Sequence, residues 1–186
     1  MSSLLVVFPG IRYSCDRSML YFSEMIIKEQ GYEVKELHYE MSRDSQEEID
    51  LDKSISNALL YSEEHLQDID FSKYERVIFL SKSIGTVVAG ELKKKLNLDN
   101  VSQIFITPLT ETVPYFEKDD LIITSNNDRF FPDAAEKVAP FNNSYVFPNC
   151  PHSFEFKGNY QLTMKILTDV LGVISRYVQT IDQKLD

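Results

Sequence analysis

The sequence predicts an α/β domain built on an open, doubly wound, mostly parallel sheet of six strands with helices on both faces. Short, uninterrupted apolar runs alternate along the chain with longer segments in which apolar residues recur at helical spacing. Continuous apolar runs of strand length are typical of parallel strands that are buried on both faces. No repeat and no linker-like stretch divides the 186 residues, so we expect one domain over residues 1–186.

Six segments have the length and composition of strands. The first is residues 4–8 (LLVVF), which Pro9 and Gly10 close. The second, residues 32–39, alternates apolar and charged side chains, as expected near a sheet edge. The other four are the apolar runs at 76–80, 103–107, 121–124 and 144–147.

Four segments have helical spacing of their apolar residues. For the first of them, Asp16 is the expected N-cap and Gly31 the expected stop. The four predicted helices span residues 16–29, 45–70, 84–96 and 161–181. In doubly wound sheets, ligands bind beyond the carboxyl ends of the strands. This rule places function in the loops at 9–15, 40–47, 81–85, 107–118, 125–133 and 148–157.

Charge and cysteine content exclude several classes of function. The chain has 29 acidic and 19 basic residues, a net charge of −10, which disfavours binding to nucleic acids and to anionic membranes. No stretch approaches the roughly 20 apolar residues of a membrane helix, and no signal-like segment opens the chain, so we expect a cytoplasmic protein. The two cysteines, Cys15 and Cys150, predict neither a disulfide framework nor a zinc site, because no tightly spaced ligand partners accompany them.

The segment SKSIG, residues 81–85, lies where the third strand meets a helix. It resembles the nucleophile elbow G-x-S-x-G of the α/β-hydrolases, with Ser81 in place of the first glycine. The elbow needs small residues because strand and helix approach closely there, and Gly85 meets that need. Taken alone, the motif slightly favours Ser83 as an N-cap of the following helix over Ser83 as a nucleophile. Lys82 occupies a variable position of the motif and is expected to be exposed to solvent.

Two later loops extend the resemblance. After the fifth strand, Asp128 precedes Pro132 as in the family's turn that carries a catalytic acid. After the sixth strand, His152 occupies a loop similar to the one that carries the family's histidine. The chain order of Ser83, Asp128 and His152 is that of nucleophile, acid and base in this family. Rivals for the acid position are Asn127 and Asp133, and an Asx-turn residue is the alternative for all three.

The resemblance also implies where an oxyanion would bind. One donor would be the backbone N–H of Ile84, and the other would come from the loop after the first strand, with Ile11 as the candidate. Gly10 allows the backbone of that loop to approach closely. Gly10 and the flanking Arg12 and Tyr13 are candidate contacts to the substrate.

The resemblance covers the chain from Leu4 to the last helix, at reduced size. It implies a minimal α/β-hydrolase fold with strand order 2-1-3-4-5-6, and a short segment at 107–118 in place of a lid. We therefore expect a serine hydrolase acting on a small-molecule carboxylic ester or thioester, without a cofactor or a metal. The sequence does not indicate an oligomeric state.

Two alternatives come from other classes of protein. The first is a non-catalytic, hydrolase-like binding or interaction protein, which the serine at position 81 and the short lid region motivate. The second is a flavodoxin-like nucleotide binder, which is disfavoured because the chain has no G-x-G-x-x-G or G-x-x-x-x-G-K-[ST] loop.

Overall fold

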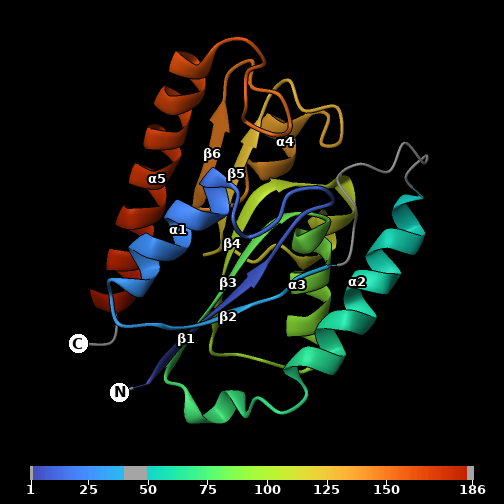
Figure 1. The fold of residues 1–186 in the computed structure, drawn as a ribbon, viewed down its shortest axis with the longest axis vertical. Helices are drawn as coiled ribbons and strands as arrows, with labels where there is room; N and C mark the ends of the chain where they lie inside the picture. Colours follow the sequence, from blue (N-terminus) through green and yellow to red (C-terminus); the bar gives the residue numbers. More distant parts are fainter. Residues whose placement is uncertain (1, 40–49, 184–186) are drawn as a thin grey trace.

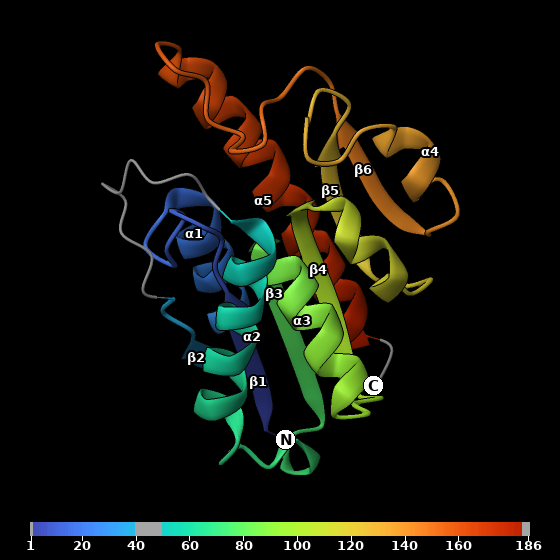
Figure 2. The ribbon, with the colours of Figure 1, turned by 90° about the vertical axis from the view of Figure 1, so that its right-hand side faces the viewer.

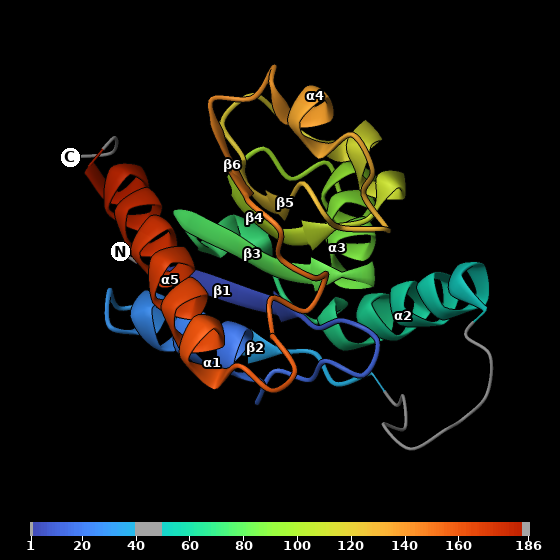
Figure 3. The ribbon, with the colours of Figure 1, turned by 90° about the horizontal axis from the view of Figure 1, so that it is seen from above.

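The computed structural model describes residues 2–39 and 50–183. These residues form a six-stranded sheet in the order β2-β1-β3-β4-β5-β6. All five strand pairings are parallel, so the predicted fold class and strand order are confirmed. Figure 1 shows the sheet with its helices, and Figure 3 shows the same layers from above.

The strands and helices follow one another in regular alternation. The strands are β1 (Ser3–Phe8), β2 (Glu33–Glu36), β3 (Arg76–Ser83), β4 (Val101–Pro108), β5 (Leu121–Ser125) and β6 (Asn143–Phe147). The α-helices are α1 (Ser18–Lys28), α2 (Leu51–Leu66), α3 (Ile84–Lys95), α4 (Ala134–Val138) and α5 (Tyr160–Gln183). Two short 3₁₀ helices, η1 (Phe71–Lys73) and η2 (Thr110–Tyr115), complete the set.

Helices cover both faces of the sheet. Helices α1 and α5 pack together on one face, and α2 and α3 cover the other (Figure 1). Helix α4 lies beside β5 and β6, at the edge opposite β2 (Figure 2). Because successive strand residues point to opposite faces, Leu5 and Val7 of β1 join the core under α1 and α5, whereas Leu4, Val6 and Phe8 join the core under α2 and α3.

Two helix starts differ from the expectation. Helix α1 begins at Ser18 after Arg17, which makes no side-chain cap, so the prediction of Asp16 as N-cap is wrong. Helix α2 begins at Leu51, where the Asp50 side chain accepts a hydrogen bond from the Lys53 amide (3.0 Å). The predicted helical residues 45–49 and the loop at 40–47 lie outside the described residues.

The expectations about the end of α1 and about the segment at 107–118 agree with the structure. After α1, Gly31 adopts φ +88°, a conformation suited to glycine, as its predicted role as a stop requires. The segment at 107–118 is short and folds into η2. Among residues 2–39 and 50–183, none of the helices combines the length and the apolar character needed to cross a bilayer.

Candidate active site

Ser83 stands at the corner between β3 and α3. Its backbone has φ 55° and ψ −123°, a strained conformation for a residue other than glycine. The serine is at the N-cap position of α3, but its side chain makes no capping hydrogen bond. The structure therefore contradicts the simple reading of Ser83 as a helix cap, and the strain presents its hydroxyl to the loops beyond the sheet.

Close backbone packing explains the small residues around this corner. A Cβ added to Gly85 would lie 2.4 Å from the Phe8 carbonyl oxygen and 2.6 Å from that of Pro9, so α3 touches the end of β1 directly. On the other side, a Cβ on Gly10 would lie 3.0 Å from the Ser83 Cβ. The loop after β1 is thus held against the serine, as the predicted elbow requires.

Ser81 fits where the family motif has glycine. Its side chain is fully buried, and its hydroxyl donates a hydrogen bond to the Ile104 carbonyl on β4 (3.1 Å). The hydroxyl thereby finds a partner on the neighbouring strand, which satisfies the extra polar group in the interior.

Ser83, His152 and Asp128 form a continuous hydrogen-bonded chain. His152 Nδ1 lies 2.6 Å from Asp128 Oδ2, and His152 Nε2 lies 2.9 Å from Ser83 Oγ. With Nδ1–H donated to the carboxylate, Nε2 is free to accept the proton of the serine hydroxyl. The three residues come from the ends of β3, β5 and β6, and the topology brings those ends to one edge of the sheet.

Asp128 is the acid that the fold directs to the histidine. It is buried, and its second carboxylate oxygen accepts a hydrogen bond from the Phe130 amide (2.9 Å). The rivals point elsewhere: Asn127 is exposed, and Asp133 adopts a left-handed conformation at the start of α4. The ring of Phe130 packs edge-on against the His152 imidazole, with 4.8 Å between centroids.

Burial sets the protonation state of the imidazole. Loss of solvent lowers the pKa of His152 below its ordinary value, although the hydrogen bond with Asp128 opposes this effect and the charge of Lys82 adds to it. A lowered pKa keeps His152 neutral at neutral pH. The imidazole is then in the form that accepts a proton from a hydroxyl group.

Solved structures with this fold include several hydrolases. XC6422 from Xanthomonas campestris, described as an α/β serine hydrolase without a lid, superposes with a TM-score of 0.65 at 14% identity, over 96% of this chain and 81% of that one. An α/β serine hydrolase homologue from Coxiella burnetii gives 0.60 at 12% identity, over 94% and 84%. Est1E from Butyrivibrio proteoclasticus, solved with ferulic acid, gives 0.55 at 12% identity, over 93% and 90%.

This chain has a small α/β-hydrolase fold. The identification rests on the sheet, its order and these superpositions. No protein-family model matches the sequence, and neither does any curated protein.

Lys82, at the variable position of the elbow motif, does not point to solvent. The expectation of an exposed side chain is wrong, because Lys82 is only 1% exposed. Its ammonium donates to the Thr107 hydroxyl (2.7 Å) and to the main-chain carbonyl of His152 (3.1 Å), and lies 4.7 Å from the centre of the Tyr13 ring. Lys82 therefore ties the elbow to the loop that carries the histidine.

Strand alternation explains why this lysine is buried. Ile78 and Leu80 of β3 point into the core under α1 and α5, so Lys82, two residues further on, faces the same side. The β3–β4 pairing shifts register between Lys82 and Ser83, which leaves Thr107 as an extra residue with φ 43°. Such a bulge changes the direction of a side chain, and here it places the Thr107 hydroxyl beside the Lys82 ammonium. The period-two pattern was a usable signal for the burial of Lys82, but its partners were not visible in the sequence.

A second set of contacts fixes the histidine loop. The Ser125 hydroxyl at the end of β5 donates to the Cys150 carbonyl (2.7 Å) and accepts from the Cys150 amide (3.0 Å). Further along this loop, Glu155 forms an ion pair with Arg17. Sequence reasoning missed these supporting residues because each contact joins segments far apart in the chain.

The loop after β1 presents the predicted oxyanion and substrate residues. Gly10 and Tyr13 exchange two main-chain hydrogen bonds (3.0 and 3.2 Å), which close a tight turn around Ile11 and Arg12. Ile84 is the first residue of α3, where helical amides have no partner within the helix. Donation by Ile11 and Ile84 to an oxyanion stays a prediction.

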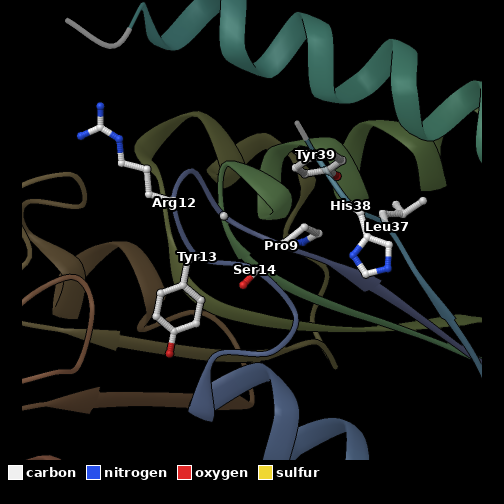
Figure 4. A pocket seen from close by; sticks show the side chains of 8 residues that line it. Pro9, Arg12, Tyr13, Ser14, Leu37, His38 and Tyr39 are labelled. Atoms are coloured by element: carbon white, nitrogen blue, oxygen red, sulfur yellow. The ribbon is translucent and has the colours of Figure 1, made fainter. Parts of the chain in front are cut away.

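The three predicted substrate contacts have different surroundings. Gly10, Arg12 and Tyr13 all line a pocket of about 80 Å³ (Figure 4). The Tyr13 ring is largely buried under Lys82, and its hydroxyl accepts a hydrogen bond from the Met19 amide (3.3 Å). The Tyr13 ring therefore packs against the Lys82 ammonium. Contact of any of the three with a substrate stays a prediction.

Proposed function

We propose that this protein is a serine hydrolase that cleaves a small carboxylic ester or thioester. The observation that carries the proposal is the hydrogen-bonded chain from Ser83 through His152 to Asp128. A serine hydroxyl is a weak nucleophile unless a base removes its proton in the transition state. Here a neutral imidazole is within hydrogen-bonding distance, and a buried carboxylate orients it.

The proposed reaction has two steps. The Ser83 oxygen attacks the substrate carbonyl carbon while His152 Nε2 takes the hydroxyl proton, and the resulting oxyanion is bound by the amides of Ile11 and Ile84. Collapse breaks the bond to the alcohol or thiol, which leaves with the proton held by His152. A water molecule then attacks the acyl-serine in the same manner and releases the acid. Asp128 stabilises the imidazolium in both steps.

The geometry also bears on the alternative, a binding protein without catalytic activity. That reading predicts a His152 that cannot reach both Ser83 and Asp128. Both distances are within hydrogen-bonding range, and the serine carries the backbone strain typical of a nucleophile at a strand-to-helix corner. These observations favour an enzyme.

Labelling with a fluorophosphonate tests the proposal. In this reaction the serine oxygen displaces fluoride from phosphorus, so an activated serine becomes covalently modified. We expect the wild-type protein to be labelled and Ser83→Ala to lose labelling by about 10³-fold or more. Hydrolysis of a series of nitrophenyl esters and acyl thioesters would then define the acyl preference.

A matched control separates loss of the nucleophile from loss of the fold. Ser62 is a buried serine on α2 whose hydroxyl donates to the Ala58 carbonyl (2.6 Å), far in sequence from the elbow. Ser62→Ala should be labelled like the wild type. Labelling that persists in Ser83→Ala would refute the assignment, and a wild-type protein that is neither labelled nor active on any ester would favour the binding alternative.

A further inference from the structure

A second group of reactive side chains lies at the same edge of the sheet. Cys15, Glu36 and His38 bring a sulfur, an oxygen and a nitrogen atom within 4.8 Å of one another. We call these three residues the Cys15 cluster. Sequence analysis predicted no metal site because the cysteine and the histidine are 23 positions apart. The fold brings these two residues close together in space.

The course of the chain after β2 explains the juxtaposition. The Leu37 amide donates to the Val7 carbonyl (3.1 Å), which extends the strand pairing beyond Glu36. The Leu37 side chain enters the core under α2 and α3. In extended chain, its neighbours Glu36 and His38 then face the opposite side, where Cys15 belongs to the core under α1 and α5.

The cluster is closed at one end and open at the other. The Cys15 thiol is buried and donates a hydrogen bond to the Leu37 carbonyl (3.4 Å). His38 Nε2 lies 3.2 Å from Glu36 Oε2, and the His38 side chain is 63% exposed. An ion can therefore approach from solvent and reach a sulfur atom at the base of the site.

We infer that Cys15, Glu36 and His38 bind Zn²⁺ or a similar borderline divalent cation. Zinc prefers thiolate, imidazole and carboxylate ligands, whereas magnesium and calcium prefer oxygen alone. Tetrahedral zinc with bonds of about 2.0–2.3 Å holds its ligand atoms roughly 3.5 Å apart. His38 Nε2 and Glu36 Oε2 are already at such a spacing, 3.2 Å apart. On binding, the thiol proton is released to solvent, and water supplies the fourth ligand.

The position of the cluster relates it to the proposed active site. His38 lines the pocket that Gly10, Arg12 and Ser14 also line (Figure 4). Cys15 ends the same loop whose turn holds Ile11. An ion on the cluster would join this loop to the chain after β2.

Direct metal titration tests the inference without any measurement of hydrolysis. The metal-free protein would be titrated with Zn²⁺ by calorimetry, and with Co²⁺ by absorption, where a sulfur-to-cobalt charge-transfer band reports thiolate ligation. We expect one equivalent to bind, with affinity at least tenfold weaker in Cys15→Ser and in His38→Ala. His38→Ala changes an exposed side chain, so it remains informative if Cys15→Ser folds poorly.

Two matched variants serve as controls. Cys150 is the other buried cysteine, and His65 is an exposed histidine on α2. Cys150→Ser and His65→Ala should bind zinc like the wild type. The inference fails if the wild type binds no zinc, if cobalt binding gives no charge-transfer band, or if His38→Ala binds as tightly as His65→Ala.

Discussion

The two faces of the sheet hold the elbow in different ways. On the α3 face the contact is steric, because Gly85 lets the helix touch the carbonyl groups of Phe8 and Pro9. On the α1 and α5 face it is polar, because the buried ammonium of Lys82 connects Thr107 with the main chain of His152. A steric contact of this kind is independent of pH, whereas the polar contact depends on a titratable group. The two faces should therefore respond differently to substitution and to pH.

The largest loss of stability is expected from substitution of Gly85, on the α3 face of the sheet. In Gly85→Ala the new Cβ would meet two carbonyl oxygens at 2.4 and 2.6 Å, and neither backbone can yield without moving β1 or α3. We expect the free energy of unfolding to fall by about 3 kcal/mol or more, together with loss of fluorophosphonate labelling. Urea denaturation followed by circular dichroism measures the first quantity.

Gly172→Ala provides the matched control. This glycine lies within α5, and its added Cβ would meet only the Arg176 guanidinium, at an ordinary 3.5 Å. Alanine favours the helix, so stability should rise by roughly 0.5–1 kcal/mol. If Gly85→Ala were as stable as Gly172→Ala, the steric account of this face would be wrong.

The next largest effect is expected from substitution of Lys82, on the α1 and α5 face of the sheet, where stability depends on pH. Burial lowers the pKa of Lys82 from 10.5 to about 7, while Asp128 and Glu155 oppose this shift and Arg17 adds to it. Between pH 7 and 10.5 the unfolded chain binds a proton that the folded chain does not, so stability rises with pH across this window. Lys82→Met should flatten that rise. The same variant should slow labelling roughly 10- to 100-fold, because the histidine loop loses its anchor.

Lys93→Met is the control for that experiment. Lys93 of α3 is also largely buried, but its ammonium pairs with Glu117 (2.8 Å), away from the histidine loop. Labelling of Lys93→Met should match the wild type. Equal labelling rates for Lys82→Met and Lys93→Met would show that the contact with His152 has no part in positioning the imidazole.

The smallest effect is expected at Ser81, where glycine would restore the family motif. Ser81→Gly removes a small buried side chain and its one hydrogen bond to Ile104. We expect a loss of about 1 kcal/mol in stability and less than a twofold change in labelling. A large gain in labelling would mean that serine at this position restrains the nucleophile.

The fold and the order of the candidate site residues were accessible from the sequence for a local reason. Apolar runs of strand length and helical spacing are properties of consecutive residues, and they predicted every strand of the sheet. Likewise Ser83, Asp128 and His152 each follow a predicted strand. Because parallel strands end at a common edge of the sheet, the topology brings these three residues together.

The supporting contacts were not accessible in this way. Nothing near Lys82 in the chain indicates Thr107 or the carbonyl of His152, because both partners reach it through the β3–β4 register shift and the loop after β6. The Cys15 cluster likewise depends on the side to which Glu36 and His38 point after β2 ends. Such contacts depend on register and loop geometry, which individual residue patterns do not encode.

By itself, the sequence determined the doubly wound sheet, because strand-length apolar runs and helical spacing are local patterns of hydrophobicity. The elbow and the candidate serine, acid and histidine came from the resemblance of three short segments to those of the α/β-hydrolases. Only the tertiary structure decided that Lys82 is a buried anchor, that Asp128 rather than Asp133 faces His152, and that Cys15 lies beside His38. Those outcomes depend on distances between segments remote in the chain, and packing of the whole domain sets those distances.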